Sequence, residues 1–477
     1  MIDSTEMAVV DRNAVALGVA ETNLMESAGN AVAREVRAQL DGDGAVTIVA
    51  GRGNNGGDAL VAARFLADLD PVVHLLGHPD RIRSEVTREK WDALQQTEVE
   101  TVVVRDSTGI ELGKPDVIVD AILGTGVSGA PREPERTAIE AINDRGARVV
   151  SVDVPSGMDV DTGNTPGTAV EADRVVTFHD LKPGLADRED VTVASIGIPG
   201  AASRFVGPGD LRRLDRPSDA HKGDFGRVLV VGGGPYTGAP ALTAQAALRA
   251  GADLATVLAP ETVADEIQGY SEDLIVMPVP GQKIGPEHVE TIVDAARERD
   301  VLVLGPGLGE TADTRRAVAE VVGSYSGRAV LDADAIAAVR NTEIAASVIC
   351  TPHRGEFTDL GGGRGTTRGE WEAAAAGLAD ELGVTILLKG THDVITDGPR
   401  TRINRTGNPG MTVGGTGDVL AGVTGAMYAA LDPVQAASLG AYLTGTAGDL
   451  AAEDRDGGLL ATDLLETLPA ALRGEQR

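Results

Sequence analysis

Residues 404–427 read NRTGNPGMTVGGTGDVLAGVTGAM, and no other stretch of the chain indicates its fold as strongly. The glycine turn Gly414-Gly415-Thr416-Gly417 runs into a helical segment that we expect to start near Asp418. Exposed amides at a helix start form an anion site, which suits the charge on a transferring phosphoryl group. Asp418 is placed to take a proton from an attacking hydroxyl, so we predict it to be catalytic. The alternative is an ordinary first-turn acid favoured by the helix dipole.

Short apolar runs alternate with helical spacers before this stretch, which is typical of parallel α/β layers. In the second half we predict strands at 227–233, 255–259, 301–305, 328–332, 347–350 and 385–389. Glycines or acids stand at the ends of several of these strands. The motif TPHRGEF (351–357) places His353 and Glu356 just past one of them, where a ligand contact is slightly favoured over a structural role.

The first half shows the same alternation, after a helix expected over 21–40. We predict its strands at 45–50, 72–76, 101–104, 116–120, 148–154 and 191–198. Behind the first strand, Gly51, Gly53 and Gly56 spell G-x-G-x-x-G before a helix, the context of a dinucleotide-binding turn. The usual ribose-binding acid at the end of the next strand is missing, which argues against an ordinary NAD dehydrogenase.

Polar side chains gather in the turns that follow these strands. Asn54, Asn55 and Asp58 lie in the first turn, and could line a small oxygen-rich site for a cation or sugar hydroxyls. Two further strands end at Asp120 and near Asp153 and run into glycine-bearing turns. Because the carboxyl ends of parallel strands meet at one edge, we expect the three turns to converge on one crevice. Turn-forming Asn residues, or three independent helix caps, are the structural alternatives.

The composition excludes several classes of protein. The chain has 477 residues, with 42 Lys+Arg against 72 Asp+Glu, and a formal net charge of −30. This charge repels nucleic acids and anionic membranes, so we expect neither as a partner. The single Cys350 excludes a disulfide framework and a cysteine zinc cluster. The N-terminus lacks the features of a signal peptide, so we expect a cytoplasmic protein. The acid excess favours a halophile over a merely GC-rich genome.

A polar stretch with Pro and Gly but no sustained period separates the two series of strands, and we place the domain boundary in it. The sequence therefore predicts two three-layer α/β domains, 1–211 and 212–477. The first is expected to contain a Rossmann-like parallel sheet. Both are long enough to bury a core of their own. The halves share no motif order, so we expect no internal duplication.

Four motifs of the first half, MESAGNAVA (25–33), GRGNNGGDA (51–59), DAILGTGVSG (120–129) and DVPSGMD (153–159), resemble the NAD(P)H-hydrate epimerase domain. The resemblance implies a potassium ion held by Asn55, Asp120 and Ser156, and Asp153 as the catalytic base. The residues implied to face the hydrated nicotinamide nucleotide are Asn54, Asn55, Gly56, Gly57, Asp58, Gly124, Thr125, Gly126, Val127, Ser128, Gly129, Ala130 and Asp153. The family loop usually ends Gly-Asp-Gly, where this chain has Ala59.

The second half resembles the NAD(P)H-hydrate dehydratase of the ribokinase-like fold. The motifs are HKGDFGRVLVVGG (221–233), GAP (238–240), GPGLG (305–309), TPHRGEF, LLKGTHDVI (387–395) and GNPGMTVGGTGD (407–418). The resemblance implies that the hydrated nucleotide contacts Ala239, Gly307, His353 and Asp418. It implies that the adenine nucleotide contacts Lys389, Gly390, Thr391, His392, Asp393 and Gly417. The His392-Asp393 pair departs from the usual form of that segment.

Together the resemblances imply an enzyme that repairs hydrated nicotinamide nucleotides. One domain would interconvert the R and S hydrates of NADH and NADPH (NADHX and NADPHX). The other would phosphorylate the S hydrate from ADP, with magnesium, and eliminate phosphate, leaving AMP. The choice of ADP over ATP and the oligomeric state, with a homo-oligomer among the possibilities, stay open. The alternatives are a ribokinase-like kinase of a vitamin precursor with an appended nucleotide-binding domain, and a first domain that binds nucleotide without turnover.

Overall fold

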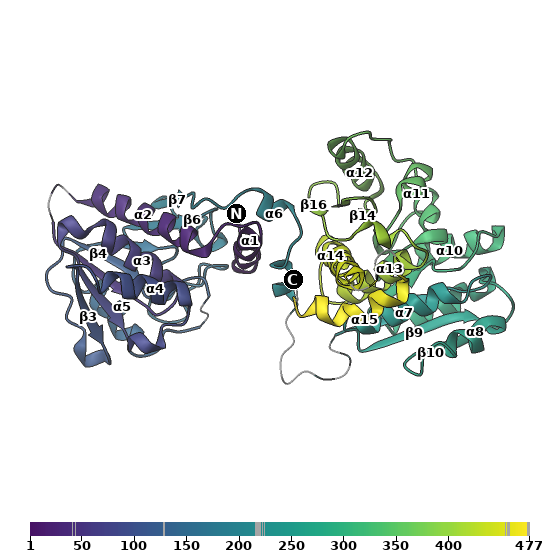
Figure 1. Cartoon of the computed structure of the whole chain (residues 1–477), viewed down its shortest axis with the longest axis horizontal. Helices are drawn as coiled ribbons and strands as arrows, with labels where there is room; N and C mark the ends of the chain where they lie inside the picture. The colour runs from purple at the N-terminus through teal and green to yellow at the C-terminus, as the bar shows by residue number, and fades with distance from the viewer. Residues whose placement is uncertain are drawn as a thin grey trace. The chain divides into compact units, whose positions relative to one another are not determined.

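The computed structural model describes the chain except residues 41, 43, 127, 128, 215–220, 222, 224, 454, 456, 457 and 475–477 and the side chain of residue 341. The described residues form two compact units, Met1–Ala202 and Ser203–Arg477, each an α/β layered fold (Figure 1). The units divide nine residues before the boundary predicted from composition (202 against 211).

The first unit contains a seven-stranded parallel sheet in the order β3-β2-β1-β4-β5-β6-β7. Its strands are β1 Val46–Ala50, β2 Val72–Leu76, β3 Glu100–Val104, β4 Val117–Ala121, β5 Arg148–Val152, β6 Arg174–Phe178 and β7 Val191–Ala194. Chain order reverses between β1 and β4, which lie side by side at the centre. In an open parallel sheet this is the point where ligands bind, outside the carboxyl ends of the strands.

Helices cover both faces of this sheet. They are α1 Ser4–Ala16, α2 Glu21–Gln39, α3 Asn54–Phe65, α4 Glu85–Leu94 and α5 Glu135–Asn143, and the short α6 Ala201–Arg204 follows. Alternate residues of β1 point to opposite faces: Ile48 joins the core beneath α2 and α3, and Val49 joins the core beneath α5. This burial on both faces confirms the three-layer prediction.

The second unit contains a nine-stranded sheet in the order β10-β9-β8-β11-β12-β13-β14-β15-β16. Its strands are β8 Arg227–Val231, β9 Leu254–Pro260, β10 Ile275–Val279, β11 Val301–Leu304, β12 Arg328–Leu331, β13 Ser347–Cys350, β14 Thr385–Leu388, β15 Asp393–Thr396 and β16 Thr401–Asn404. The strands from β10 to β14 run parallel, and β15 and β16 add an antiparallel hairpin. Here chain order reverses between β8 and β11.

Two groups of helices cover the larger sheet. They are α7 Gly238–Arg249, α8 Glu261–Gln268, α9 Val289–Arg297, α10 Ala312–Ser324, α11 Arg354–Asp359, α12 Arg368–Leu382, α13 Thr416–Tyr428, α14 Pro433–Ala452 and α15 Ala461–Leu472. One core joins the sheet to α7, α13, α14 and α15, and the other joins it to α9 and α10. None of the helices whose residues are described is long and apolar enough to span a membrane.

The sequence did not predict α1 or four of the strands, β6, β10, β15 and β16. Strand β10 lies at a sheet edge and contains Pro278, which has no amide hydrogen for a strand ladder and so weakens the pattern. Strands β15 and β16 have four residues each, and the polar Thr396, Thr401 and Asn404 interrupt their apolar pattern.

The segment after Ser203 belongs to the second unit because it pairs with the edge of that sheet. Phe205 forms a parallel bridge to Ile403 of β16. The Arg402 guanidinium donates to both carboxylate oxygens of Asp210 at 3.0 Å, and Asp210 is 1% exposed. The Arg405 guanidinium also lies 4.0 Å from the centre of the Phe205 ring. These contacts explain why the division falls earlier than the composition predicted.

We expect Asp210→Asn to destabilise the second unit by about 3–5 kcal/mol, because it leaves the buried Arg402 charge without its partner. Trp91 and Trp371 are the two tryptophans of the chain, one in each unit. Urea unfolding followed by Trp371 fluorescence in a Trp91→Phe background therefore reports the second unit. The exposed Arg212 lies in the same turn, and Arg212→Gln should change stability by less than about 0.5 kcal/mol. Equal midpoints for the two variants would contradict this role of Asp210.

Candidate active sites at the two strand edges

The first site lies where β1, β4 and β5 end. Asp120 is the penultimate residue of β4 and is fully buried. One oxygen of its carboxylate accepts the Ser151 hydroxyl at 2.7 Å and the Ser156 amide at 2.9 Å, and the other accepts the Ser156 hydroxyl at 2.5 Å. Burial raises the pKa of Asp120, and the hydrogen bonds from Ser156 and Ser151 oppose that rise. Asp120 and Ser156 therefore come together as predicted.

Asn55 completes this group from the start of α3. Its amide nitrogen donates to the Leu123 carbonyl oxygen at 3.2 Å, and the Leu123 amide donates to the Ser156 hydroxyl at 2.9 Å. The amide oxygen Oδ1 of Asn55 is buried and has no hydrogen-bond partner among the described residues. A buried acceptor without a donor is costly, so this oxygen is suited to a cation.

Two positions in the turn after β1 must be glycine, because backbone carbonyl oxygens lie where a side chain would begin. A Cβ on Gly51 would lie 2.0 Å from the Ile122 carbonyl oxygen, and a Cβ on Gly56 would lie 2.0 Å from the Gly51 carbonyl oxygen. The turn after β1 and the end of β4 therefore touch through their backbones. A side chain at either position would separate the elements that bring Asn55 and Asp120 together.

Asn54 and Asp58, predicted to contact substrate, differ in their surroundings. The Asn54 amide nitrogen donates to Glu21 at 3.0 Å, and its oxygen accepts the Ser84 hydroxyl at 2.5 Å and the Thr87 hydroxyl at 3.3 Å. The side chain of Asn54 is thus held by protein groups. Asp58 faces the same edge, and burial raises its pKa well above the ordinary value, with the nearby carboxylate of Asp153 adding to the rise.

Asp153 has an unusual backbone. Its φ is +64°, and the Val154 amide donates across it to the Val152 carbonyl oxygen at 2.8 Å in a γ-turn. This conformation is rare for a residue with a side chain, and such strain is often found at functional sites. The carboxylate accepts the Thr177 hydroxyl at 3.0 Å and lies 3.4 Å from the Lys182 ammonium. The sequence did not predict Lys182, although a lysine is rare in this chain and this one follows a strand end.

The remaining predicted substrate residues of the first unit lie in two loops. Gly57 is buried at the start of α3. Thr125 is half-buried, as is Gly124, whose added Cβ would lie 3.0 Å from the Asn55 side chain. Gly126, Gly129 and Ala130 are exposed. The predicted residues Val127 and Ser128 lie outside the described residues.

The second site lies where β8, β11, β12, β13 and β14 end. Gly307 follows β11 with a φ of +71°, and a Cβ there would lie 2.9 Å from the Tyr236 carbonyl oxygen and 3.4 Å from the Ala239 side chain. Ala239 is in the first turn of α7, after the glycine turn that follows β8. The structure thus brings the predicted residues Ala239 and Gly307 together. The Tyr236 side chain beside them is 65% exposed.

His353 caps α11 at this edge. Its Nδ1 atom accepts the amides of Gly355 and Glu356 at 3.0 Å each, and its own amide donates to the Glu356 carboxylate at 2.7 Å. Accepting with Nδ1 leaves the proton of a neutral ring on Nε2. The side chain is 62% exposed, and its Nε2 atom lies 3.6 Å from the Glu356 carboxylate. His353 also forms a bridge with Lys389 of the next strand end.

Lys389 lies between buried acids and the glycine turn. Its ammonium is 3.1 Å from Asp332, which also accepts the Thr351 hydroxyl at 2.6 Å. Burial alone would lower the pKa of Lys389, but Asp332, Glu356 and Asp418 together raise it. A Cβ on Gly417 would lie 3.5 Å from the ammonium, so this charge is next to the start of α13. The motif with Asp332 stood at a predicted strand end, but its role was not predicted.

Asp418 lies in the first turn of α13, which begins at Thr416 after Gly415 at a φ of +97°. Burial raises the pKa of Asp418 from 3.8 to about 7, with Asp332 adding to the rise and Lys389 opposing it. A carboxyl group poised near neutrality at an anion-binding helix start is suited to proton transfer. This supports the prediction of Asp418 as a base over an ordinary first-turn acid.

The predicted nucleotide segment divides into structural and accessible residues. Asp393 accepts the Gly390 amide at 3.0 Å and the Asn404 amide at 3.0 Å, so its carboxylate fastens the turn to β16. Burial raises the pKa of Asp393, and the bonds from Asn404 and Gly390 oppose the rise. Thr391 and His392 are exposed at the tip. Asp393 therefore positions the loop, and its neighbours are free to meet a ligand.

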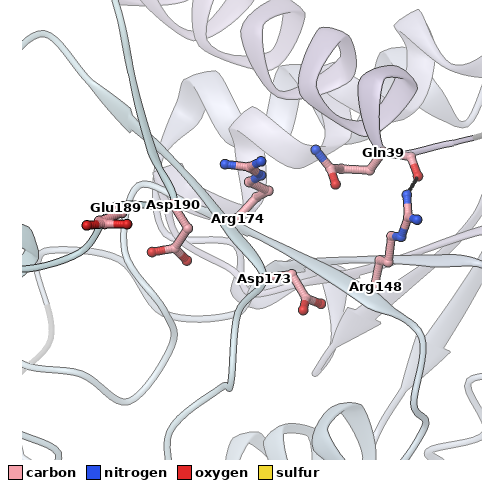
Figure 2. A pocket seen from close by; sticks show the side chains of 6 residues that line it. All are labelled: Gln39, Arg148, Asp173, Arg174, Glu189 and Asp190. Carbon is pink, nitrogen blue, oxygen red and sulfur yellow. Dashed lines mark hydrogen bonds between the residues drawn. The ribbon is translucent and has the colours of Figure 1, made fainter.

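A depression of about 460 Å³ lies at the opposite edge of the first sheet, where β5, β6 and β7 begin (Figure 2). It is lined by Gln39, Arg148, Asp173, Arg174, Glu189 and Asp190. Two arginines and three acids line it with Gln39, and Arg148 donates to the Gln39 carbonyl oxygen. None of the predicted site residues lines it, so it is separate from the chemistry described above.

Comparison with known proteins agrees with this division. Residues 21–184 match the family described as YjeF-related protein N-terminus, and residues 228–470 match the family described as NAD(P)H-hydrate dehydratase. A bifunctional NAD(P)H-hydrate repair enzyme of Methanothermobacter thermautotrophicus is 43% identical over 98% of this chain and 94% of its own. The chain belongs to the family of bifunctional NAD(P)H-hydrate repair enzymes. The relative from Pyrobaculum aerophilum is also 43% identical, over 99% of this chain and 98% of its own.

Solved structures show the same fold for the second unit. The ADP/ATP-dependent NAD(P)H-hydrate dehydratase of Bacillus subtilis, co-crystallised with ATP and Mg²⁺, is 28% identical, with a TM-score of 0.51. It covers 57% of this chain and 98% of its own. A ribokinase-like superfamily protein of Enterococcus faecalis has the same TM-score and identity, over 57% of this chain and 95% of its own. The predicted family and fold are thereby confirmed.

The raised pKa of Asp418 makes stability depend on pH with a definite sign. Between 3.8 and about 7 this carboxyl is ionised in the unfolded chain but neutral in the folded one, so rising pH favours unfolding until the folded group ionises. From pH 5 to 8 we expect wild type to lose roughly 3 kcal/mol relative to Asp418→Asn, which has no such group. Urea unfolding followed by Trp371 fluorescence, in the Trp91→Phe background, measures the stability of the chain with Asp418 and of the Asp418→Asn variant. Parallel stability curves would show that Asp418 titrates normally.

Proposed function

We propose that the Met1–Ala202 unit interconverts the R and S hydrates of NADH and NADPH, and that the Ser203–Arg477 unit dehydrates the S hydrate with ADP. Family membership supports the pairing of an epimerase-like and a dehydratase-like unit. The observation that carries the proposal is that each unit gathers its predicted acids at the carboxyl edge, with Asp153 in one and Asp418 in the other. Pairing is useful because hydration produces both epimers and the dehydratase accepts one.

In the first unit, Asp153 is our candidate for the carboxylate that moves a proton when the hydroxyl-bearing carbon is epimerised. Its carboxylate is fixed by hydrogen bonds and the γ-turn, so it needs no rearrangement to face the substrate. The loop from Gly124 to Ala130 would cover the nucleotide, and the exposure of its described residues suits that role.

We propose a potassium ion at Asn55, Asp120 and Ser156. The residues fit such an ion because Asn55 Oδ1 is a buried acceptor with no donor among the described residues, and Leu123 links Asn55 to Ser156, which is bonded to the buried Asp120 carboxylate. Bound there, the cation would supply a fixed positive charge near the phosphates of the nucleotide. Asn55, the Leu123 carbonyl and Ser156 would hold it between the ends of β1 and β4.

In the second unit, Asp418 would take the proton of the substrate hydroxyl as that oxygen attacks the terminal phosphate of ADP. The amides of Gly414 to Gly417 and the Lys389 ammonium would stabilise charge on the transferring phosphoryl group. Elimination of phosphate then restores the dihydronicotinamide and leaves AMP. We assign magnesium to the nucleotide, because the related dehydratase of Bacillus subtilis was co-crystallised with ATP and Mg²⁺.

The net charge of the chain bears on the salt content of the cell in which it works. We propose a cytoplasm rich in potassium salts, where a net charge of −30 keeps the protein solvated and the potassium site filled. A vitamin-precursor kinase would share the glycine turn and Asp418, but it would yield a stable phosphorylated product instead of NADH. Family membership favours repair.

We expect an Asp153→Ala variant, given mixed hydrates with ADP and magnesium, to restore only the S fraction as NADH. Wild type should restore both fractions in the same time, because its first unit converts R to S. Absorbance of NADH measures the recovery. Asp187 is an exposed acid outside the site, and Asp187→Ala should behave as wild type. If wild type regenerates no NADH, the dehydratase assignment is wrong.

Potassium should stabilise the first unit, because a ligand that binds only the folded state adds up to about 2.7 kcal/mol at a hundredfold excess over its Kd. Trp91 fluorescence in a Trp371→Phe background reports this unit. We expect a higher melting temperature in potassium chloride than in tetramethylammonium chloride at equal ionic strength. Asn55→Ala should abolish the difference, and the exposed control Asn164→Ala should keep it. A difference that survives in Asn55→Ala would rule out this site.

A further inference from the structure

Lys182 is a fully buried lysine that the reaction outlined above does not use. Its ammonium donates to the Thr177 hydroxyl at 3.1 Å and to the carbonyl oxygens of Phe178 at 2.7 Å and Asp180 at 3.1 Å. These acceptors are neutral, and a buried charge is costly unless an opposite charge lies near it. The carboxylate of Asp153, 3.4 Å away and 14% exposed, supplies that charge.

Asp153 is held in place by the same segment that carries Lys182. Its amide donates to the Val176 carbonyl oxygen at 2.7 Å. Its Oδ1 atom accepts the Thr177 hydroxyl at 3.0 Å and the Phe178 amide at 3.4 Å, and faces the Lys182 ammonium. The strained φ of +64° persists because these contacts fix both backbone and side chain. Asp153 is therefore an oriented carboxylate with a cation behind it.

Asp58 is the second carboxyl group of the site. Unlike Asp153, it has no hydrogen-bond donor and no cation beside it among the described residues. It lies half-buried in the second turn of α3. The charged groups that act on it are the carboxylates of Asp153, Asp11 and Glu21, which, after burial, raise its pKa well above 3.8. His179, at the end of β6, is no second cation, because burial and then Lys182 lower its pKa.

We propose that Lys182 is a positioning residue of the epimerisation site, whose buried ammonium orients the carboxylate of Asp153 as the base, with the carboxyl group of Asp58 as the acid. The inference rests on the proposed epimerase function. It assigns opposite roles to two carboxyl groups at one edge: Asp153 is the base and Asp58 the acid. The asymmetry comes from one buried cation on the side of Asp153.

The chemistry of the hydrated ring suits such a pair. The hydroxyl is on the carbon next to the ring nitrogen. Asp58 gives its proton to the departing hydroxyl oxygen while the carbon–oxygen bond breaks and the nitrogen lone pair forms a carbon–nitrogen double bond, leaving water. Water then adds to the opposite face, the new carbon–oxygen bond forms, and Asp153 takes the proton released. The net transfer of one proton from Asp58 to Asp153 is reset by exchange with solvent.

Without the ammonium, the carboxylate of Asp153 loses the buried opposite charge that faces it and fixes its orientation. The test is exchange between R and S hydrates by the full-length chain without nucleotide, so that dehydration does not run. We expect a bell-shaped dependence of kcat/KM on pH for wild type. In Lys182→Met the acidic limb should move at least one unit to higher pH, and the maximum should fall at least tenfold.

Two further variants test the proposed roles of Asp58 and of the contact between Lys182 and Asp153. Asp58→Asn should lower kcat by about 10²-fold or more, with KM changed little, because it removes the proton donor. Thr177→Val removes the hydroxyl between Asp153 and Lys182 and should move the acidic limb in the same direction by a smaller amount. Lys90, half-buried and paired with Glu26 elsewhere in the unit, is the matched control, and Lys90→Met should leave the profile in place.

Trp91 fluorescence establishes that each variant is folded. A folded Lys182→Met with the wild-type profile, or an Asp58→Asn with the wild-type exchange rate, overturns the inference. If Lys182→Met does not fold, Asp58→Asn and Thr177→Val decide it. If wild type exchanges no epimers at all, the proposed function of the first unit fails and this inference fails with it; an active wild type with unmoved variants sinks the inference alone.

Discussion

Burial of both faces of a parallel sheet confines polar chemistry to the strand ends, and both units meet this constraint with a buried acid. Asp120 at the end of β4 and Asp332 after β12 each accept a hydroxyl from the next strand end, Ser151 in one unit and Thr351 in the other. Each acid is also joined to a functional group: Asp120 to Ser156 and Asp332 to Lys389. These anchored carboxylates thereby hold Ser156 at one edge and Lys389 at the other.

How far the sequence could predict the sites depended on whether a residue belonged to a turn with its own pattern. Asn55 and Asp120 were predicted together because glycine turns at strand ends are legible in a sequence. Lys182 was missed because its partners are backbone carbonyls and an acid that only the fold brings near. The resemblance implied that Asp393 contacts the nucleotide, and what the sequence could not predict is that its carboxylate also accepts the Gly390 amide and holds the loop. Strand β10 was missed because it contains Pro278, and proline in an apolar run argues against a strand. An edge strand tolerates proline, since only one of its sides pairs with a neighbour.

The acidic composition and the sites are reconciled by where the scarce lysines lie. Lys182 is fully buried and Lys389 is largely enclosed, and each has an aspartate within hydrogen-bond or ion-pair distance. A lysine is a compact charge that can approach a single oxygen, whereas an arginine would spread its charge across a planar fork. An acidic surface therefore coexists with local positive charge at both strand edges, because the ammonium groups of Lys182 and Lys389 lie below the surface.

The bridge between Phe205 and Ile403 has a consequence for the edge of the larger sheet. Strand β16 ends the nine-stranded sheet, and an uncovered edge strand invites pairing with another molecule. The residues that leave the first unit cover this edge with a backbone hydrogen bond from Val206 and the ring of Phe205. This segment thus shields the sheet from self-association, and a second unit that lacked it would expose an unpaired β-edge to its own copies.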